Sequence, residues 1–247
     1  MNRVRSSRLA TRLVSLAVCV AVAGGIAISR RGHGAAHSSP GSITRPDAKI
    51  SNDPTRALLV PHAEGDVTLD GDLDDAGWAG RIARTGPFFT ESGVVARPYS
   101  DARLVWGDDH LYVALYAADE DIRADAREPD GPVWLDDAFR LVFESATGER
   151  AFDVSALGVV TDARRTKGGK FDYGWQSAIH VATERDGTLN DPRDDDEEWL
   201  LELAIPLAAL GLAGRKGERI ALSARRCDTP KTGGRVCAGW GSTLVLD

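Results

Sequence analysis

The chain has 247 residues, of which 43% are hydrophobic and 27% are charged, with 26 glycines, 11 prolines and three cysteines. This composition excludes collagen-like, wholly disordered and disulfide-scaffold proteins. The net charge of −7 is unevenly distributed, because residues 1–31 carry six arginines and no acidic residue, which leaves −13 on the remainder. An acidic body argues against nucleic-acid binding through a phosphate-neutralising surface.

Residues 1–31 are predicted to be a signal peptide or a signal anchor. An arginine-rich stretch precedes Leu13–Ile28, an uncharged and mostly apolar run that is too short for a hydrocarbon core of ~30 Å. Ala21-Val22-Ala23 fits the small-x-small pattern of a signal-peptidase cleavage site. An uncleaved anchor is an alternative, because Arg30 and the arginine that follows it could cap a short membrane span. Lipid attachment at Cys19 is a third alternative. In each case we expect the body to be extracytoplasmic, either secreted or periplasmic, with membrane contact only through residues 13–28.

Residues 32–56 are predicted to be a flexible linker, because glycine, serine, proline and small polar residues dominate them. The folded domain is therefore expected over residues 57–247. Inside it, Cys227 and Cys237 flank a segment that contains one proline and two glycines. In an oxidising compartment these cysteines predict a disulfide that closes a turn between two strands. Two free buried thiols are the alternative.

The domain is predicted to be all-β, an antiparallel β-sandwich of the jelly-roll or immunoglobulin-like kind. Half-buried strands are indicated by segments in which apolar and polar residues alternate or in which residues typical of strands gather. These segments are 103–106, 111–116, 138–143, 152–155, 199–205, 219–225 and 236–245. Turn residues between the first two and the next two segments predict two hairpins. Pro206 to Leu210 predicts one helical turn, which Gly211 ends. No long segment has the 3.6-residue period of a helix, which disfavours helix bundles and βαβ folds.

The second hairpin has a register that can be predicted from its turn. A two-residue turn at Thr147-Gly148 pairs Leu141 with Val154 and keeps both on the buried face. Arg140 then lies opposite Ser155 and diagonal to Asp153 on the outer face. We therefore expect Arg140 and Asp153 to pair on a sheet surface, either within a binding site or as an exposed ion pair worth less than about 1 kcal/mol.

Four stretches of the chain, in this order, resemble carbohydrate-binding module family 9. They are residues 68–75 (TLDGDLDD) with Trp78; residues 102–105 leading into 109–113; residues 134–139 (WLDDAF) followed by 152–155 and Gly158; and residues 198–199 with 202–206. Together they cover about residues 66–245. The resemblance implies a β-sandwich that binds sugars without cleaving them, and therefore not an enzyme. It also implies a sugar gripped between aromatic rings, and structural calcium in some members.

The resemblance also implies roles for individual residues. Trp134 matches a tryptophan that stacks on the sugar, and Asp137 matches the acid that starts the following strand. Family members commonly have glutamate where this chain has Arg140, and a basic residue and an amide where it has Asp153 and Ser155. The acidic and basic residues are thus exchanged across one strand pair. Arginine only donates hydrogen bonds, while ionised aspartate only accepts them. The exchange can therefore either alter the sugar preference or abolish binding.

A second stacking ring is expected from Trp175 or Trp240. Trp175 follows an aromatic, glycine-containing loop, and an indole can cover the apolar C–H face of a pyranose while its edges stay wet. Trp78 and Trp199 lie within the stretches that resemble the family and are expected in the core, as is Trp106.

Other functions and ligands remain as alternatives. A structural or adhesion module of the same fold would have lost sugar binding, and an accessory part of a glycoside hydrolase system is a further alternative. An electron-transfer haem subunit is disfavoured because Met1 is the one methionine, so the folded domain has no methionine that could serve as a haem ligand. No cofactor is expected, although structural calcium stays open. An EF-hand loop that begins at Asp70 would need glycine at its sixth position and glutamate at its twelfth, where Asp75 and Arg81 stand, so residues 70–75 indicate a turn and helix cap instead. Residues 191–198 predict a solvated loop or, less favourably, calcium ligands.

Overall fold

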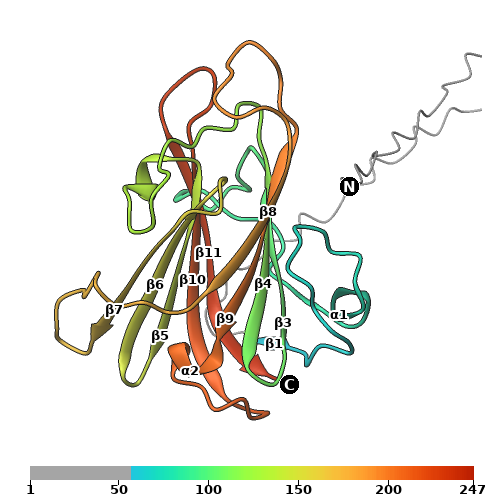
Figure 1. Cartoon of the computed structure of the whole chain (residues 1–247), viewed down its shortest axis with the longest axis vertical. Helices are drawn as coiled ribbons and strands as arrows, with labels where there is room; N and C mark the ends of the chain where they lie inside the picture. The colour runs from blue at the N-terminus through green and yellow to red at the C-terminus, as the bar shows by residue number, and fades with distance from the viewer. Residues whose placement is uncertain (1–56) are drawn as a thin grey trace, which may run out of the picture. The chain divides into compact units, whose positions relative to one another are not determined.

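Two β-sheets face each other in the computed structural model, which describes residues 57–247 (Figure 1). The six-stranded sheet has the order β1 (Leu58–Val60), β11 (Val236–Leu246), β10 (Arg219–Asp228), β5 (Ala138–Ser145), β6 (Gly148–Ser155) and β7 (Val160–Thr166). The five-stranded sheet has the order β2 (Ala83–Arg84), β3 (Ser100–Trp106), β4 (His110–Ala118), β9 (Glu198–Pro206) and β8 (His180–Asp186). The strands pair antiparallel except β1 with β11, which confirms the predicted fold class.

The helical elements are short. They are α1 (Ala76–Ala79), the 3₁₀-helix η1 (Val133–Leu135) and α2 (Leu207–Leu210). None of the helices in residues 57–247 is long and apolar enough to cross a membrane. The predicted signal segment 1–31 and linker 32–56 lie outside the described residues.

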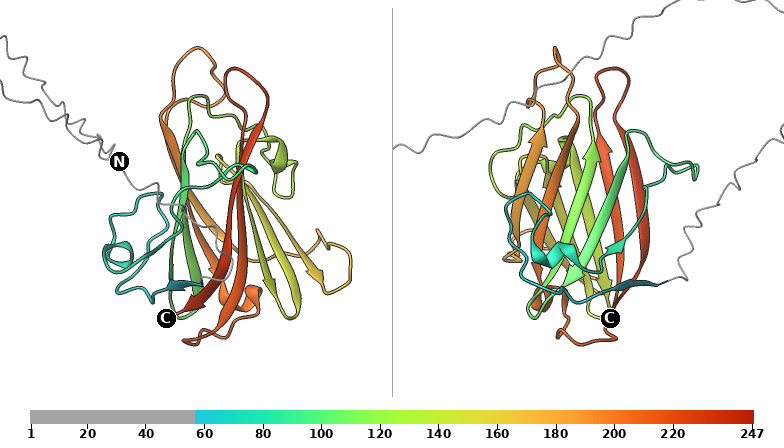
Figure 2. Two further views of the ribbon diagram at one scale, coloured as in Figure 1. Left: turned by 180° about the vertical axis from the view of Figure 1, so that it is seen from behind. Right: turned by 90° about the vertical axis from the view of Figure 1, so that its right-hand side faces the viewer.

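The strands predicted from period-two alternation are all present, whereas β1, β2, β7 and β8 were not predicted. β1 and β2 are too short to show a period. β7 and β8 are edge strands with charged residues near their ends (VTDARRT and HVATERD), so neither shows an apolar face. Figure 2 shows the same two layers from behind and from the side.

The core lies between the inner faces of the two sheets. Phe139, Leu141 and Phe143 of β5 are fully buried there, as are Phe152 and Val154 of β6. Each such side chain contributes roughly 1.5–3 kcal/mol by leaving water. This burial decides which face of β5 and β6 points outward.

The tryptophans expected in the core are buried. Trp199 packs on Phe139 with ring centroids 5.2 Å apart, and its Nε1 donates to Asp119 at 2.8 Å. Trp78 donates from Nε1 to Glu202 at 2.8 Å. A buried indole N–H needs such a partner, so the structural role predicted for both residues is confirmed.

Two local predictions about helix ends are also confirmed. Asp75 caps α1, because its side chain accepts from the backbone N–H of Trp78. α2 follows Pro206 and ends at Gly211, which adopts a left-handed conformation with φ of 77°.

The register predicted for the β5–β6 hairpin is wrong by two residues. Ser145 pairs with Gly148, so Leu141 faces Phe152 and Arg140 faces Asp153 directly. Gly148 is a strand residue and not a turn residue. A Cβ there would lie 2.0 Å from the Arg165 carbonyl oxygen, so glycine is needed for the close approach of β7. A shift of two leaves every side chain on its predicted face.

The predicted disulfide is present. Cys227 and Cys237 are directly opposed on β10 and β11, with Cα atoms 4.1 Å apart. The bond therefore closes the hairpin loop of residues 228–236 and fixes the register of these two strands.

Loss of this disulfide is expected to lower the free energy of unfolding by about 2–3 kcal/mol, because the bond restricts the unfolded chain over a short loop. Urea unfolding of the full chain with and without a phosphine reductant measures the change. The double variant Cys227→Ala, Cys237→Ala serves as the control, since the reductant should not affect it. Equal stability of the oxidised and reduced protein would contradict the expectation.

Candidate functional site

The outer face of the six-stranded sheet carries three rows of side chains across β7, β6, β5, β10 and β11. The charged row is Thr161, Asp153, Arg140, Arg225 and Gly239; the small-residue row is Ala163, Ala151, Val142, Ser223 and Gly241; and the lower row is Arg165, Glu149, Glu144, Ala221 and Thr243. Same-face neighbours along a strand are roughly 7 Å apart. The small-residue row is therefore a floor between two polar borders.

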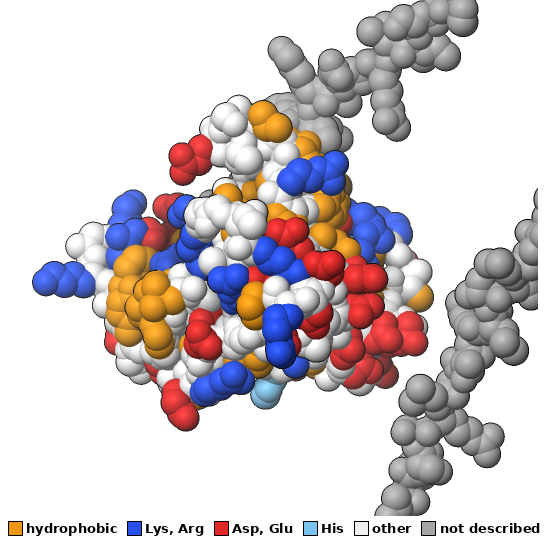
Figure 3. Space-filling view, turned by 90° about the horizontal axis from the view of Figure 1, so that it is seen from above, with side chains coloured by type: hydrophobic (Ala, Val, Ile, Leu, Met, Phe, Trp, Pro, Cys, Tyr) orange, Lys and Arg blue, Asp and Glu red, His pale blue; other side chains and the backbone are white. Residues whose placement is uncertain are grey.

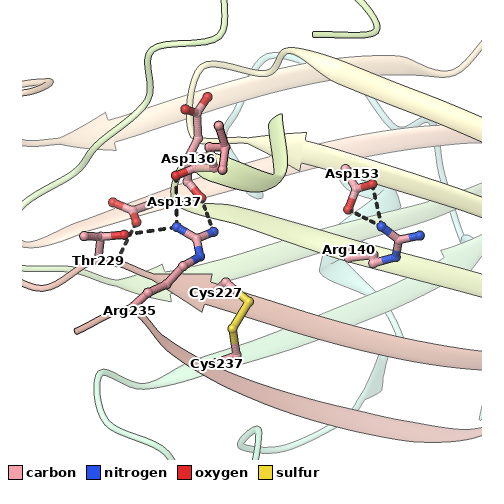
Figure 4. The surroundings of a disulfide bond; sticks show 9 residues. Asp136, Asp137, Arg140, Asp153, Cys227, Thr229, Arg235 and Cys237 are labelled. Atoms are coloured by element: carbon pink, nitrogen blue, oxygen red, sulfur yellow. Dashed lines mark hydrogen bonds and ion pairs between the residues drawn. A yellow bond between two sulfur atoms is a disulfide. The ribbon is translucent and has the colours of Figure 1, made fainter. Parts of the chain in front are cut away.

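Arg140 and Asp153 form the centre of the charged row. Nη1 of Arg140 lies 2.9 and 3.3 Å from the two Asp153 carboxylate oxygens (Figure 4). The Asp153 side chain is 7% exposed and that of Arg140 is 38% exposed, so this pair presents the guanidinium to solvent. Burial raises the pKa of Asp153 although the Arg140 charge opposes the rise. Asp153 therefore acts as a positioning residue for Arg140.

Arg225 is a site residue that the sequence did not reveal. It pairs with Arg140 across β10 and β5, two strands far apart in the chain. The outward alternation of β10 would have placed it on this face, but only the sheet order brings it beside Arg140.

An open hollow follows the β10–β11 side of the floor. One part, about 430 Å³, lies along Arg225, Ser223, Gly239 and Gly241 and is walled by residues 89–91. Phe89 forms this wall by exchanging two backbone hydrogen bonds with Gly239. A second part of about 450 Å³ shares Ser223 and Gly241 and continues along the lower row. Both volumes are in the range of small-molecule sites.

Trp134 borders this face at the end nearest the charged row. It belongs to η1, whose Val133 packs on Ala138 and Val159. The preceding loop is tied to β7, because Thr161 donates from Oγ1 to the Gly131 carbonyl at 2.6 Å. The residue is 52% exposed, which makes Trp134 the one tryptophan in residues 57–247 with a largely exposed side chain.

Arg235 holds η1 in place from the β10–β11 hairpin. Its guanidinium donates to the backbone carbonyls of Leu135 and Asp136 and, at 3.0 Å, to Oγ1 of Thr229. Figure 4 shows Arg235 reaching the η1 end beside the Cys227–Cys237 disulfide. Seen from above, this end of the sandwich is covered by charged side chains of both signs (Figure 3). The disulfide-closed hairpin thus supports the segment that carries Trp134.

Replacing Arg235 by glutamine is expected to loosen η1, because two backbone carbonyls lose their donor. Hydrogen exchange at residues 133–137 should become faster, while the free energy of unfolding changes by less than about 1 kcal/mol since Arg235 is exposed. Arg219→Gln, an exposed arginine at the other end of β10, is the matched control. Unchanged exchange over residues 133–137 would show that Arg235 does not position η1.

Solved structures with a similar arrangement include a Bacteroides uniformis protein assigned to carbohydrate binding, with a TM-score of 0.60 at 15% identity over 78% of this chain and 99% of that one. A carbohydrate-binding module family 9 from Caldicellulosiruptor kristjanssonii in complex with cellotriose matches with a TM-score of 0.53 at 14% identity, over 78% and 94% of the two chains. Its glucose complex matches at 0.53 and 13%, over 76% and 95%. The chain has the family 9 fold. No protein-family model and no curated protein matches it.

On this family 9 fold, Trp175 lies on the other side of the six-stranded sheet from Arg140. Its ring is 6.2 Å from that of Phe152, a core side chain, and the Arg150 guanidinium stacks on it at 5.5 Å. The segment between β7 and β8 crosses from one sheet to the other (Figure 1), which carries Trp175 to the inner side. The structure therefore does not place the rings of Trp134 and Trp175 on opposite sides of one ligand.

Trp240 is likewise directed inward. It pairs with Ala224, a core residue of β10, and packs against the main core while remaining partly exposed. It nevertheless contributes to the lining of the hollow beside Arg225. Among the three tryptophans expected to contact a sugar, only Trp134 has a largely exposed side chain.

Asp137 and Ser155 are placed apart from the outer surface. Asp137 has no exposed surface, and its two carboxylate oxygens accept from the backbone N–H groups of Arg123 and Thr229 at 2.7 and 2.8 Å. It thereby joins the loop after β4 to the β10–β11 hairpin. Ser155 is also fully buried, and its hydroxyl has no hydrogen-bond partner among residues 57–247. We therefore leave both out of the residues proposed to touch a ligand.

Asp137 belongs to a buried charge network at the end of the sandwich. Carboxylate oxygens of Asp119, Asp137 and Asp228 lie within 4.8 Å of one another. Arg226 donates to Asp119 at 2.9 Å, to Asp228 at 3.1 Å and to the Ala118 carbonyl at 2.7 Å. Because Arg226 is on β10 and Ala118 on β4, this network links the two sheets.

The network does not fit the structural calcium that the resemblance implies. Calcium takes six to eight oxygen ligands. Each oxygen of Asp119 and Asp137 already accepts a hydrogen bond, and of the three carboxylates only Asp228 retains one unpartnered oxygen. Arg226 supplies the positive charge instead. The acid-rich residues 191–198 likewise use carboxylates within the protein, for example Asp196, which accepts from Ile122 and Thr188.

The free energy of unfolding is expected to fall as the pH rises from about 4 to about 7. Burial, reinforced by Asp119, raises the pKa of Asp137 to about 7. Burial also raises the pKa of Asp228 to about 6, although Arg226 opposes this. In the unfolded chain both titrate near pH 4, so the folded protein binds protons that the unfolded chain has released.

Urea unfolding at pH 4.5 and pH 7.5 measures this dependence, and a loss of roughly 1–3 kcal/mol is expected. The Asp137→Asn variant should show a smaller difference between the two pH values. Stability that is equal at both pH values, or that rises with pH, would contradict the assignment.

A second hollow of about 570 Å³ lies on the outer face of the five-stranded sheet, lined by Arg103, Tyr116, Glu184, Asp186, Glu198 and Leu200 among others. Burial, together with the hydrogen bond that the Tyr116 hydroxyl donates to Glu198, raises the pKa of Tyr116 to about 12. Tyr116 and Glu198 thus engage each other, and no largely exposed tryptophan borders the hollow.

Proposed function

We propose that the protein is a non-catalytic carbohydrate-binding domain whose ligand lies on the outer face of the six-stranded sheet. The observation that carries the proposal is a small-residue floor bordered by a row of charged strand side chains, with an exposed indole beyond that row. The C. kristjanssonii modules, which have the same fold, are in complex with cellotriose and glucose.

The chemistry of this face suits a pyranose. A sugar ring has an apolar C–H face, which the indole of Trp134 can cover, and hydroxyl groups that both donate and accept. Arg140 and Arg225 supply donors, while Glu91 and Glu144 along the hollow supply acceptors. The floor carries no bulky side chain that would keep a ring from lying flat.

The proposal involves no bond cleavage and no cofactor, since every contact is made by protein side chains. We also propose that the domain works outside the cytoplasm, secreted, periplasmic or held by an N-terminal anchor. The Cys227–Cys237 disulfide supports this, because such bonds persist in oxidising compartments.

A structural or adhesion module of the same fold is the second candidate. It is favoured by one observation, namely that neither Trp175 nor Trp240 has a largely exposed ring to complete a pair of stacking rings, since both pack against the core. The two candidates differ in whether any saccharide binds.

Binding to a glycan array, followed by calorimetry on the best ligand, tests the proposal with the full chain. Trp134→Ala is expected to weaken binding about tenfold or more, because the stacking surface is lost. Tyr173→Ala is the matched control, since Tyr173 is 53% exposed but follows the far end of β7. Failure to bind any saccharide, or equal weakening by both substitutions, would contradict the proposed function.

A further inference from the structure

Two arginines stand directly opposite each other in the charged row. Arg140 on β5 and Arg225 on β10 are paired in the antiparallel register, which places their Cα atoms roughly 4.5–5.5 Å apart. Like charges at directly opposed positions destabilise a sheet. A nearby negative charge is therefore needed to neutralise these two arginines.

Within residues 57–247, only one of these two positive charges has an acidic side chain as a partner. Asp153 accepts from Nη1 of Arg140, and neither Nε nor Nη2 of Arg140 makes a hydrogen bond within residues 57–247. Arg225 is exposed and, in the same part of the chain, its side chain has no hydrogen-bond or ion-pair partner. One positive charge and several guanidinium N–H groups of the charged row are thus left without a partner among residues 57–247, and Arg225 lines the hollow.

Carboxylates also lie around the hollow, one beside Arg225 and another on the lower row. The small-residue row separates the charged row from the lower row, where Arg165 pairs with Glu149 and Glu144 is left exposed and without a partner among the described residues. Glu91 lies on the wall of the hollow. One end of the floor therefore offers excess donors with positive charge, and the other end offers a carboxylate acceptor.

We propose that the ligand is an acidic saccharide whose carboxylate binds at Arg140 and Arg225, with its ring on the small-residue floor. This inference rests on the proposed function and names the class of sugar. A guanidinium presents paired N–H donors that match a carboxylate. The hydroxyl groups of the same sugar donate to Glu91 and Glu144, which bind no carboxylate. A uronic acid unit has both kinds of group.

Matched pairs of simple glycosides test the inference on the full chain. Methyl β-D-glucuronide is compared with methyl β-D-glucoside, and methyl β-D-galacturonide with methyl β-D-galactoside, by calorimetry or NMR titration. We expect at least one acidic member to bind about tenfold more tightly than its neutral partner. The preference should decrease with added salt, because the arginines are solvent-exposed, and the methyl ester of the preferred uronide should bind like the neutral sugar.

The variant Arg225→Gln is expected to remove the preference for the acidic sugar, so that the acidic and neutral members of the pair bind with affinities within about twofold of each other. Arg219→Gln is the matched control, because it removes the same charge from the same strand and face at a distance of six residues. It should leave the preference unchanged. Circular dichroism and the unfolding midpoint confirm that both variants are folded.

The outcomes separate this inference from the function on which it rests. Equal binding of acidic and neutral glycosides, or an acidic preference that survives Arg225→Gln, overturns the inference and leaves carbohydrate binding intact. Failure of every glycoside and glycan to bind overturns both.

Discussion

The register of β5 against its two neighbours is the constraint on which the proposed site depends. Burial of Phe139, Leu141 and Phe143 directs Arg140 outward, and a slip of one residue would expose the three core side chains. The pairings with β6 and β10 then place Asp153 on one side of Arg140 and Arg225 on the other. The charged row is thus a consequence of how the core packs.

Support for the site comes from the end of the sandwich that also holds the sheets together. Arg226 links β10 to β4 through buried hydrogen bonds, while the Cys227–Cys237 disulfide closes the hairpin that follows. Arg235, on the same hairpin, binds the backbone of η1 and so positions the segment of Trp134. Stability and ligand contact therefore share one loop cluster, and loosening this hairpin would affect both.

Much of the fold follows from local sequence patterns, because period-two alternation and turn residues act within one segment. The interior strands, the cap at Asp75, the end of α2 and the disulfide were all predicted in this way. Edge strands β7 and β8 escaped prediction because polar residues occupy both faces near their ends. The turn of the β5–β6 hairpin was misplaced because Gly148 serves the approach of β7, a contact with a later strand.

The site was less predictable because it depends on contacts between distant segments. Sequence placed Arg140 and Asp153 on one face, and the alternation that did so is correct in the structure. It did not show that the loop carrying Trp175 crosses to the inner side, nor that β10 lies beside β5 and brings Arg225 to Arg140. Asp137 shared a motif with Trp134, yet the turn after η1 sends the two side chains to different environments.

The location of the ligand can be measured most directly by NMR, using backbone amide shifts of the full chain during titration with methyl β-D-glucoside and methyl β-D-glucuronide. Glycine amides give suitable reporters, because Gly239 and Gly241 lie along the proposed floor and Gly71 lines the hollow on the other sheet. The account predicts that Gly239 and Gly241 shift on titration and that Gly71 does not. Shifts at Gly71 with none at Gly239 and Gly241 would place the ligand on the five-stranded sheet and contradict it.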